Sequence, residues 1–150
     1  MERTLVLLKP DALQRGLAGR ILSRLEDRGL KLVGLKLVHM GREMAGLLYE
    51  PHVGKPFFEG LVTYMTSRPI IAAAVEGDEA VEVVRRTMGE TDPSKAAPGT
   101  IRGDLATAIG RNLVHGSDSA DSAARELPIF FDPAEMVDYD RDVEPWLTES

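Results

Sequence analysis

The sequence predicts an α+β fold of the ferredoxin-like sandwich type, a four-stranded antiparallel sheet with helices covering one face. Short apolar runs of strand length alternate with segments in which apolar residues recur every three to four positions, the spacing of one helix face. The resulting order is strand, helix, strand, helices, strand, helix, strand, helix, which is typical of the split βαβ arrangement. No repeat or interdomain linker interrupts the 150 residues, so we expect one domain over residues 1–150.

Four strands are expected, because four segments are short, apolar and bounded by residues that end strands. Pro69 to Glu76 is a continuous apolar run closed by Gly77, which predicts a buried central strand. The other three strands are expected at Arg3 to Lys9, Lys31 to Met40 and Asn112 to His115.

The helices follow from apolar periodicity and from the residues at their ends. They are expected from residue 10 to Gly16 and over residues 17–28, 44–50, 56–65, 78–88, 105–109 and 119–126, with a further start at residues 132–135. Gly29 occupies the position where glycine often ends a helix, and Pro56 is expected at the first position of the fourth helix. Gly89 to Gly99 has two prolines and no periodicity, so we expect a functional loop.

The fourth expected helix carries Phe57, Leu61 and Met65 at four-residue spacing, which places all three on one helix face. The tail from Asp138 to Ser150 has no periodicity, and no regular element is expected there.

The composition excludes several classes of protein. With 43% hydrophobic and 28% charged residues, and no apolar run near the roughly 18 residues that span a bilayer, neither a disordered chain nor a membrane protein is expected. The run from Leu5 to Leu8 is too short for a secretion signal, so we expect a cytoplasmic protein. The formal net charge of −6 disfavours nucleic acid as the main partner. The lack of cysteine excludes disulfides, thiol nucleophiles and Cys-ligated zinc.

The three histidines are the remaining candidate nucleophiles, because the chain has no cysteine and no Gly-x-Ser-x-Gly sequence. A structural role is expected for His39, within the second strand, and a solvated loop position for His52. His115 ends the last expected strand, and Gly116 after it lets other groups approach the backbone closely. The helix that follows has free N-terminal N–H groups, which suit anionic ligands.

His115 has the chemistry of a phosphate acceptor. An imidazole is largely neutral at pH 7, so one ring nitrogen has a lone pair that can attack phosphorus. Glu126, eleven residues on, could accept the hydrogen of the other nitrogen and fix the tautomer. The alternatives are a structural histidine at position 115 and an exposed helix-end acid at position 126.

Phosphate would have to be bound by side chains, because the chain has neither a Gly-x-x-x-x-Gly-Lys-Ser/Thr loop nor a Gly-x-Gly-x-x-Gly turn. Candidate donors are Lys9, Arg85, Thr91 and Arg102, and arginine offers forked contacts to phosphate oxygens. Taken alone, each of them is more typical of a solvated surface residue, and spacing alone does not bring them together. Mg²⁺ is expected as the cofactor, held mainly by phosphates and water rather than by protein ligands.

The segment Asn112-Leu113-Val114-His115-Gly116-Ser117-Asp118 resembles the active-site signature of nucleoside diphosphate kinases, Asn-x-x-His-Gly-Ser-Asp. Other segments resemble the same family in the same order, and the resemblance runs from about Thr4 to Tyr139. These segments are Thr4-Leu5 with Lys9-Pro10-Asp11, Phe57-Phe58 with Gly60-Leu61, Gly89-Glu90-Thr91, and Pro98-Gly99-Thr100-Ile101-Arg102-Gly103-Asp104.

The resemblance implies a ping-pong reaction, in which the γ-phosphate of a nucleoside triphosphate passes to a nucleoside diphosphate through a phosphorylated histidine. In this sequence His115 would be phosphorylated on Nδ1, Glu126 would orient the ring through Nε2, and Ser117 would support the site. The implied nucleotide contacts are Lys9 and Asn112 at the sugar hydroxyls and nearby phosphate, Arg85, Thr91 and Arg102 as the phosphate clamp, and Phe57, Leu61 and Tyr49 at the base. A base that is stacked but not read at its edge can vary, so broad nucleotide specificity is expected.

The resemblance also implies a homo-oligomer, and the tail to Ser150 favours a hexamer over a tetramer. Two alternatives stay open. The chain could be a catalytically silent nucleotide-binding or assembly protein, because fold does not fix function. It could also bind single-stranded nucleic acid, as ferredoxin-like sheets often do, although the acidic balance and the small number of aromatic residues argue against this.

Overall fold

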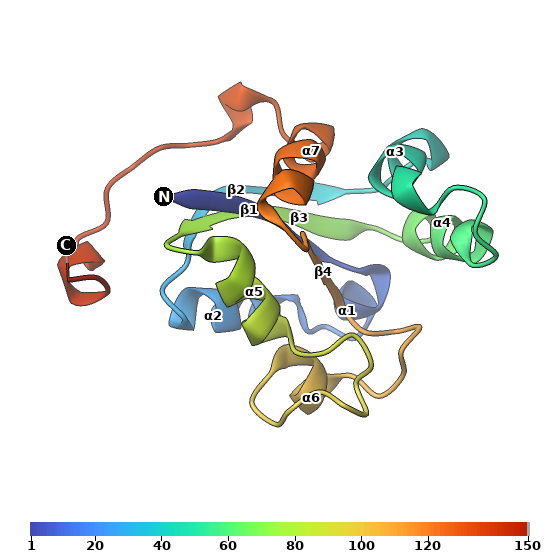
Figure 1. Ribbon diagram of the computed structural model, residues 1–150, viewed down its shortest axis with the longest axis horizontal. Helices are drawn as coiled ribbons and strands as arrows, with labels where there is room; N and C mark the ends of the chain where they lie inside the picture. The colour runs from blue at the N-terminus through green and yellow to red at the C-terminus, as the bar shows by residue number, and fades with distance from the viewer. Residues whose placement is uncertain (150) are drawn as a thin grey trace.

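The computed structural model describes residues 1–149, which fold around an antiparallel sheet with the strand order β2-β3-β1-β4 (Figure 1). The strands are β1 (Glu2–Leu8), β2 (Lys31–Val38), β3 (Ile70–Gly77) and β4 (Val114–Gly116). β1 pairs with both β3 and β4, and its Leu7 lies opposite His115. The four expected strands, the antiparallel sheet and the central position of β3 are confirmed.

The segments between and after the strands are mostly helical. They form α1 (Pro10–Gln14), α2 (Ala18–Asp27), α3 (Arg42–Leu48), α4 (Phe58–Thr66), α5 (Ala80–Met88), α6 (Ile101–Leu105) and α7 (Ala120–Phe130), with the 3₁₀ turns η1 (Glu50–His52), η2 (Pro133–Glu135) and η3 (Glu144–Trp146). Within residues 1–149, no helix has the length and apolar character needed to cross a bilayer.

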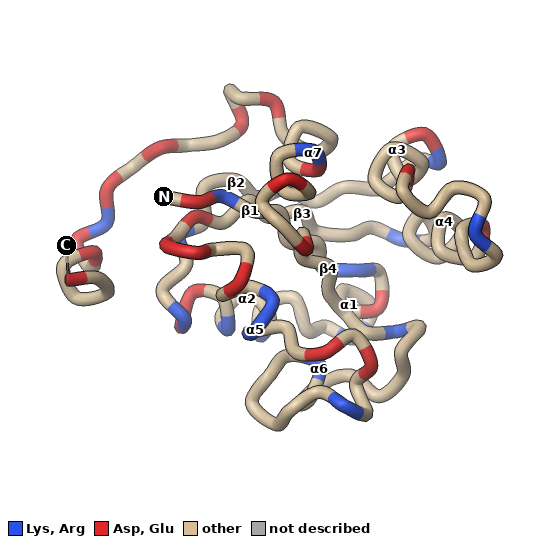
Figure 2. Tube along the Cα trace, viewed as in Figure 1, with Lys and Arg blue, Asp and Glu red and all other residues tan. Residues whose placement is uncertain are grey.

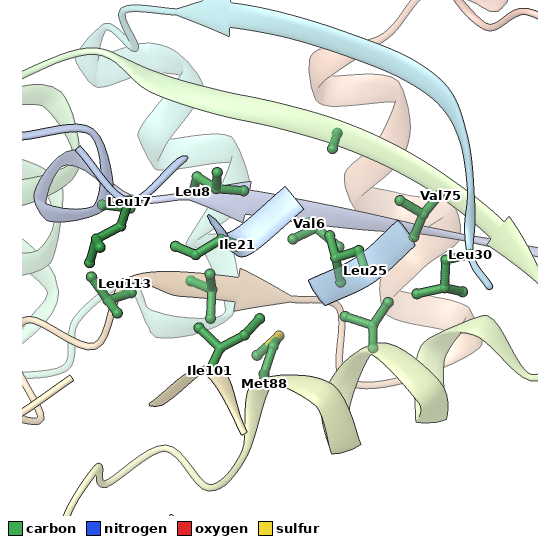
Figure 3. Packing of buried hydrophobic residues seen from close by; sticks show 14 of the residues in the cluster. Val6, Leu8, Leu17, Ile21, Leu25, Leu30, Val75, Met88, Ile101 and Leu113 are labelled. Carbon is green, nitrogen blue, oxygen red and sulfur yellow. The ribbon is translucent and has the colours of Figure 1, made fainter. Parts of the chain in front are cut away.

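Helices cover both faces of the sheet, so the expectation of one covered face is wrong. Side chains alternate between the two faces along a strand, and in β1 Val6 and Leu8 belong to one hydrophobic cluster while Leu5 and Leu7 belong to another. The first cluster is completed by α2, α5 and α6 (Figure 3), and the second by α3, α4 and α7. All four side chains are fully buried, because the strand is sandwiched between two helical layers.

The helix expected at residues 105–109 is wrong, because the chain forms α6 earlier. Thr100 explains the difference: its hydroxyl accepts a hydrogen bond from the Gly103 N–H at 3.0 Å and caps the helix. The helix expected at residues 119–126 continues to Phe130, so Glu126 lies inside α7 rather than at its end.

Two other helix starts differ from expectation. Phe57 is the N-cap of α4, so Pro56 precedes the helix rather than occupying its first position. Met65 is fully buried but Phe57 is 53% exposed, because the chain has not yet entered the helical repeat at Phe57. The capping residues at 132–135 begin only η2, a single turn in which Glu135 accepts the N–H of Asp132 at 2.8 Å.

Candidate active site

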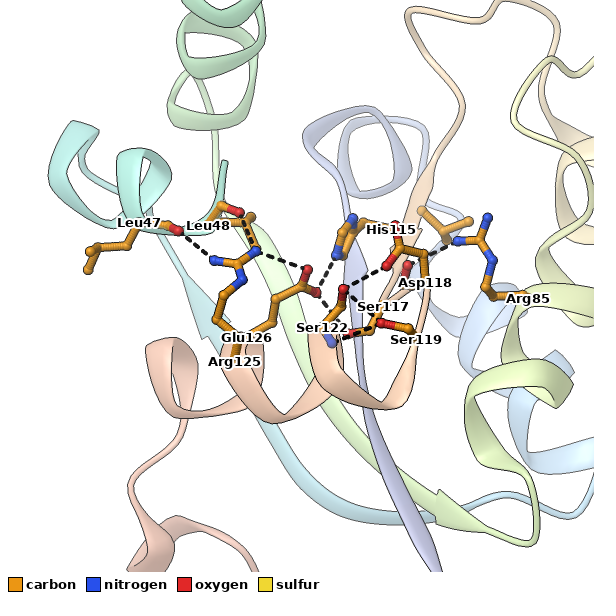
Figure 4. A network of polar contacts seen from close by, with 12 residues as sticks. Leu47, Leu48, Arg85, His115, Ser117, Asp118, Ser119, Ser122, Arg125 and Glu126 are labelled. Atoms are coloured by element: carbon orange, nitrogen blue, oxygen red, sulfur yellow. Dashed lines mark hydrogen bonds and ion pairs between the residues drawn. The ribbon is translucent and has the colours of Figure 1, made fainter. Parts of the chain in front are cut away.

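His115 is the middle residue of β4, a three-residue strand at the edge of the sheet. Its Nε2 atom lies 2.8 Å from Oε1 of Glu126 on α7 (Figure 4). Because a carboxylate can only accept a hydrogen bond, Nε2 carries the hydrogen of the neutral ring and Nδ1 keeps a lone pair. The His115 side chain is 21% exposed, so the ring is held from one side and accessible from another.

Glu126 is buried in α7, with 5% of its surface exposed. The Ser119 hydroxyl caps this helix by accepting a backbone N–H of the first turn, and Glu126 follows about two turns later. Ser117 donates a hydrogen bond to the same Oε1 at 2.8 Å. Burial acts to raise the pKa of this carboxyl, but the hydrogen bond and charge of His115, then the Ser117 hydroxyl and the Arg125 charge, hold it below its usual value. The carboxylate is therefore an acceptor at neutral pH.

A cavity of about 410 Å³ opens beside His115 and Glu126. It collects predicted nucleotide-binding residues from separate parts of the chain: Lys9, Tyr49, Arg85, Thr91, Arg102 and Asn112. A cavity of similar size, about 440 Å³, lies under the C-terminal tail and contains none of the predicted site residues. The predicted nucleotide-binding residues therefore gather at the cavity that His115 lines.

Lys9, at the end of β1, is joined to the segment before β4 by a chain of hydrogen bonds. Its Nζ donates to Oδ1 of Asn112 at 2.9 Å, and Nδ2 of Asn112 donates to the Thr91 carbonyl at 3.0 Å. Burial, and then the neighbouring Arg102 charge, lower the pKa of Lys9 from 10.5 to about 8, while Asp11 opposes the shift. An anion bound here would raise this pKa again.

Arg102 is 4% exposed and is fixed by three backbone carbonyls. Nε donates to Asn112 at 3.2 Å, Nη1 to Gly89 at 3.0 Å and Nη2 to Val114 at 2.7 Å. These contacts with residues 1–149 use three of the five guanidinium N–H groups, so two are left for a ligand. Burial, followed by the Arg85 charge, lowers the pKa of Arg102 to about 10, so the side chain stays charged at neutral pH.

Arg85 reaches the site from α5, where Nη1 donates to the Gly116 carbonyl at 3.3 Å. Within residues 1–149, Arg85, Lys9 and Arg102 take part in no salt bridge. Cations brought together without paired carboxylates favour an anionic ligand with several oxygens. The cavity is therefore suited to a phosphate chain.

Three predicted residues do not line this cavity. Ser117 is fully buried and reaches the site only through Glu126. Leu61 is half-buried and packs against the second hydrophobic cluster. Phe57 lies beside His52, a lining residue whose ring is edge-on to that of Phe57 with 5.2 Å between the ring centroids. Phe57 is thus at the rim, with its ring available to solvent.

Sequence reasoning did not assign two charged residues, Asp118 and Arg125, to the site. Asp118 lines the cavity and accepts a hydrogen bond from Ser122 at 2.7 Å, which, with smaller contributions from Arg85 and His115, lowers its pKa. Arg125 also lines the cavity beside Glu126. Asp118 belongs to the signature segment from Asn112 to Asp118, so the sequence could have indicated it. Nothing in the sequence indicates Arg125, because its partners are backbone carbonyls of a distant helix.

Comparisons with known proteins agree with this geometry. A model of the family described as "Nucleoside diphosphate kinase" matches residues 2–136. The chain is 54% identical to a nucleoside diphosphate kinase of Thermomicrobium roseum, with 98% of this chain and 99% of the relative covered, and 56% identical to one of Heliobacterium modesticaldum, with 99% and 100% covered. A solved structure of a halophilic nucleoside diphosphate kinase from Halobacterium salinarum, in complex with CDP, superimposes with a TM-score of 0.95 at 50% identity over 98% of each chain. This chain therefore belongs to the nucleoside diphosphate kinase family.

Proposed function

We propose that this chain moves the γ-phosphate of a nucleoside triphosphate to a nucleoside diphosphate by a ping-pong mechanism, with His115 as the phosphate carrier. One observation carries the proposal: the 2.8 Å contact of Nε2 with Glu126 leaves Nδ1 as the nucleophile beside a cavity that holds Lys9, Arg85 and Arg102.

The first half-reaction exchanges one P–O bond for one P–N bond, and the second reverses the exchange. The Nδ1 lone pair attacks the γ-phosphorus, the bond to the bridging oxygen breaks, and the nucleoside diphosphate leaves with that electron pair. A terminal oxygen of a second diphosphate then attacks the phosphorus and releases Nδ1. The ring gains positive charge when it carries phosphorus, and Glu126, held as a carboxylate, stabilises that charge through the Nε2 hydrogen.

The cationic side chains act on the charge of the transferred group. In a loose transition state the negative charge lies on oxygens of the transferred group and the leaving group. The remaining N–H groups of Arg102, with Arg85 and Lys9, are in place before the reaction, so little reorganisation is needed to stabilise this charge. Thr91 and Asn112 contribute polar groups at the same wall of the cavity.

The base is proposed to bind at the rim, where Phe57 exposes its ring and Tyr49 and Leu61 lie on neighbouring segments. Stacking depends on the π-face that all bases share, which supports broad nucleotide specificity. The CDP bound by the Halobacterium salinarum relative is consistent with nucleotides as the ligand class.

Mg²⁺ is proposed to enter with the nucleotide. Among residues 1–149 there is no group of three His, Asp or Glu side chains that could hold a metal ion, and Asp118 is the carboxylate that lines the cavity besides Glu126. Mg²⁺ often binds through substrate phosphates and its own water rather than through a protein cage, and this donor set fits that mode. When bound, the ion would neutralise phosphate charge.

Phosphorylation by radiolabelled ATP tests the proposal directly. The protein should acquire label that resists base and is lost in acid, as expected for a phosphoramidate, and His115→Ala should abolish it. His39→Ala is the matched control, because His39 follows the end of β2, is exposed, and hydrogen-bonds through its ring to the Thr66 carbonyl at 3.0 Å. Label that persists in His115→Ala would show that another residue carries the phosphate.

Other expectations also stay proposals. A homo-oligomer is supported by the exposed apolar residues Leu35 and Leu37 on the edge strand β2, and by Trp146, which is 88% exposed. The hexamer also stays a proposal, which sedimentation tests, and Ser150 lies outside the described residues. Acidic residues outnumber basic ones in the segment after α7 (Figure 2), which argues against nucleic acid as the main partner. The single-domain organisation and the cytoplasmic location are tested by cooperative unfolding and by cell fractionation.

A further inference from the structure

Arg125 joins α7 to the end of α3. Its Nη1 donates to the Leu47 carbonyl at 2.9 Å and its Nη2 to the Leu48 carbonyl at 3.1 Å (Figure 4). The last carbonyls of a helix have no partner within the helix, so a guanidinium that reaches two of them anchors the helix end. Leu48 and Tyr49, which caps α3, both line the cavity of the proposed site.

The same guanidinium also contacts the carboxylate that holds His115. Nη2 of Arg125 lies 3.4 Å from Oε2 of Glu126, whereas Oε1 accepts from His115 and Ser117. Both oxygens of Glu126 are therefore engaged, and the carboxylate plane is set by groups on either side. Arg125 is 37% exposed at its side chain, so water screens its charge, and its main contribution is geometric.

We propose that Arg125 is a positioning residue for phosphate transfer: it fixes the Glu126 carboxylate, and through it the His115 ring, relative to the cavity wall at the end of α3. The inference rests on the proposed function, since it assumes that His115 carries the phosphate. Arg125 does not touch the reacting atoms; it sets the direction in which Nδ1 faces the cavity.

A double-mutant cycle with Glu126 separates this role from simple structural support. Arg125→Met should lower kcat by about tenfold with KM changed less than about twofold, because support of an orienting group is lost while phosphate contacts remain. In a Glu126→Gln background the same change should alter kcat by less than about twofold. An equal fall in both backgrounds would overturn the proposal.

The tautomer of His115 provides a readout that structural support would not move. Nitrogen NMR of the imidazole should show one tautomer, with hydrogen on Nε2, in the parent protein and a mixture in Arg125→Met. An unchanged tautomer alongside a tenfold lower kcat would contradict the inference. Arg125→Lys is a milder second variant that keeps the charge but loses the forked guanidinium donors. It should show the same coupling to Glu126 with a smaller fall in kcat.

Arg42→Met is the matched control, because Arg42 also ties α3 to another helix through an exposed contact, at 2.6 Å, with Glu59. It should leave both kcat and the tautomer unchanged; equal effects in Arg42→Met would show that any loosening of α3 suffices. Labelling of the parent protein separates the two proposals. An unlabelled parent protein removes the proposed function, whereas a labelled parent protein without coupling removes only the role of Arg125.

Discussion

Asp11 accepts a hydrogen bond from the backbone N–H of Leu113 at 3.1 Å, and another from the Tyr64 hydroxyl. The backbone of Leu113 has a φ of 74°, in the left-handed region that few residues other than glycine adopt. Its side chain is fully buried and its carbonyl accepts the Lys9 N–H at 2.8 Å. Asp11 therefore holds a strained turn two residues before His115.

Asp11→Ala should lower the free energy of unfolding by about 2–4 kcal/mol, because the strained Leu113 backbone and the Tyr64 hydroxyl both lose a charged acceptor. Chemical denaturation at a fixed protein concentration measures this. Glu26→Ala, at an exposed acid on α2, is the control and should change stability by no more than about 0.5 kcal/mol. A loss in Asp11→Ala no larger than the control would show that the turn does not depend on Asp11.

The strands could be predicted because their cause is local. Apolar runs closed by Gly or Pro predict the bounds of β1 and β3 to within about one residue. The continuous apolar run from Leu5 to Leu8 also indicates that both faces of the sheet are covered. A strand that faces solvent on one side alternates, whereas a strand buried on both sides is continuously apolar. The expectation of one covered face neglected this pattern.

The arrangement around Arg102 could not be predicted, because its cause is not local. The carbonyl of Gly89, after α5, and those of Asn112 and Val114, at the start of β4, meet at one guanidinium. No spacing in the sequence encodes such a meeting. The left-handed Leu113 gives no signal either, since glycine is the residue that usually marks that conformation. The resemblance to a known family supplied the candidate site residues, whereas their hydrogen bonds and burial came from the structure.

Arg102→Lys and Arg85→Lys should differ in their effect on stability. One ammonium cannot replace a fork that reaches the carbonyls of Gly89, Asn112 and Val114, so Arg102→Lys should lose about 2–4 kcal/mol as well as activity. Arg85 makes one long contact, at 3.3 Å, so Arg85→Lys should lose activity while its stability changes by less than about 1 kcal/mol. Parallel unfolding curves and steady-state assays measure both. Similar stability losses in the two variants would assign Arg102 no special structural role.

Lys9 should give the activity an alkaline limit. Its pKa of about 8 means that the free enzyme loses this cation as the pH rises above 8, and kcat/KM, which reports the free enzyme, should fall there. Lys9→Met should have a lower kcat/KM at every pH and should lack this fall. A fall near pH 8 that survives in Lys9→Met would belong to another group.

The contribution of Lys9 to stability should rise with pH, whereas its contribution to activity should fall. The unfolded chain keeps the Lys9 proton up to about pH 10.5, whereas the folded chain releases it near 8. Between these pH values the unfolded state binds more protons, so the contribution of Lys9 to the free energy of unfolding rises with pH. The difference in stability between the parent protein and Lys9→Met should therefore move in favour of the parent protein from pH 8 to 10, as measured by denaturation at each pH.

Ser117→Ala should show a pH-dependent loss of stability, because the Ser117 hydroxyl helps to hold the pKa of Glu126 below its usual value. A carboxyl with a depressed folded-state pKa stabilises the protein above its unfolded pKa, and this contribution is lost as the pH falls through the folded pKa. Ser117→Ala should therefore cost about 1–3 kcal/mol at pH 7 and less in acid, where Glu126 is protonated in both proteins.

Denaturation at pH 7 and at a pH below the folded-state pKa of Glu126 measures this difference. Ser67→Ala is the control, because the exposed Ser67 hydroxyl donates to a neutral acceptor, the Tyr64 carbonyl, at 2.6 Å, and its loss should cost the same at both pH values. A cost for Ser117→Ala that does not change between these two pH values would mean that the hydroxyl stabilises the fold without acting on the ionisation of Glu126.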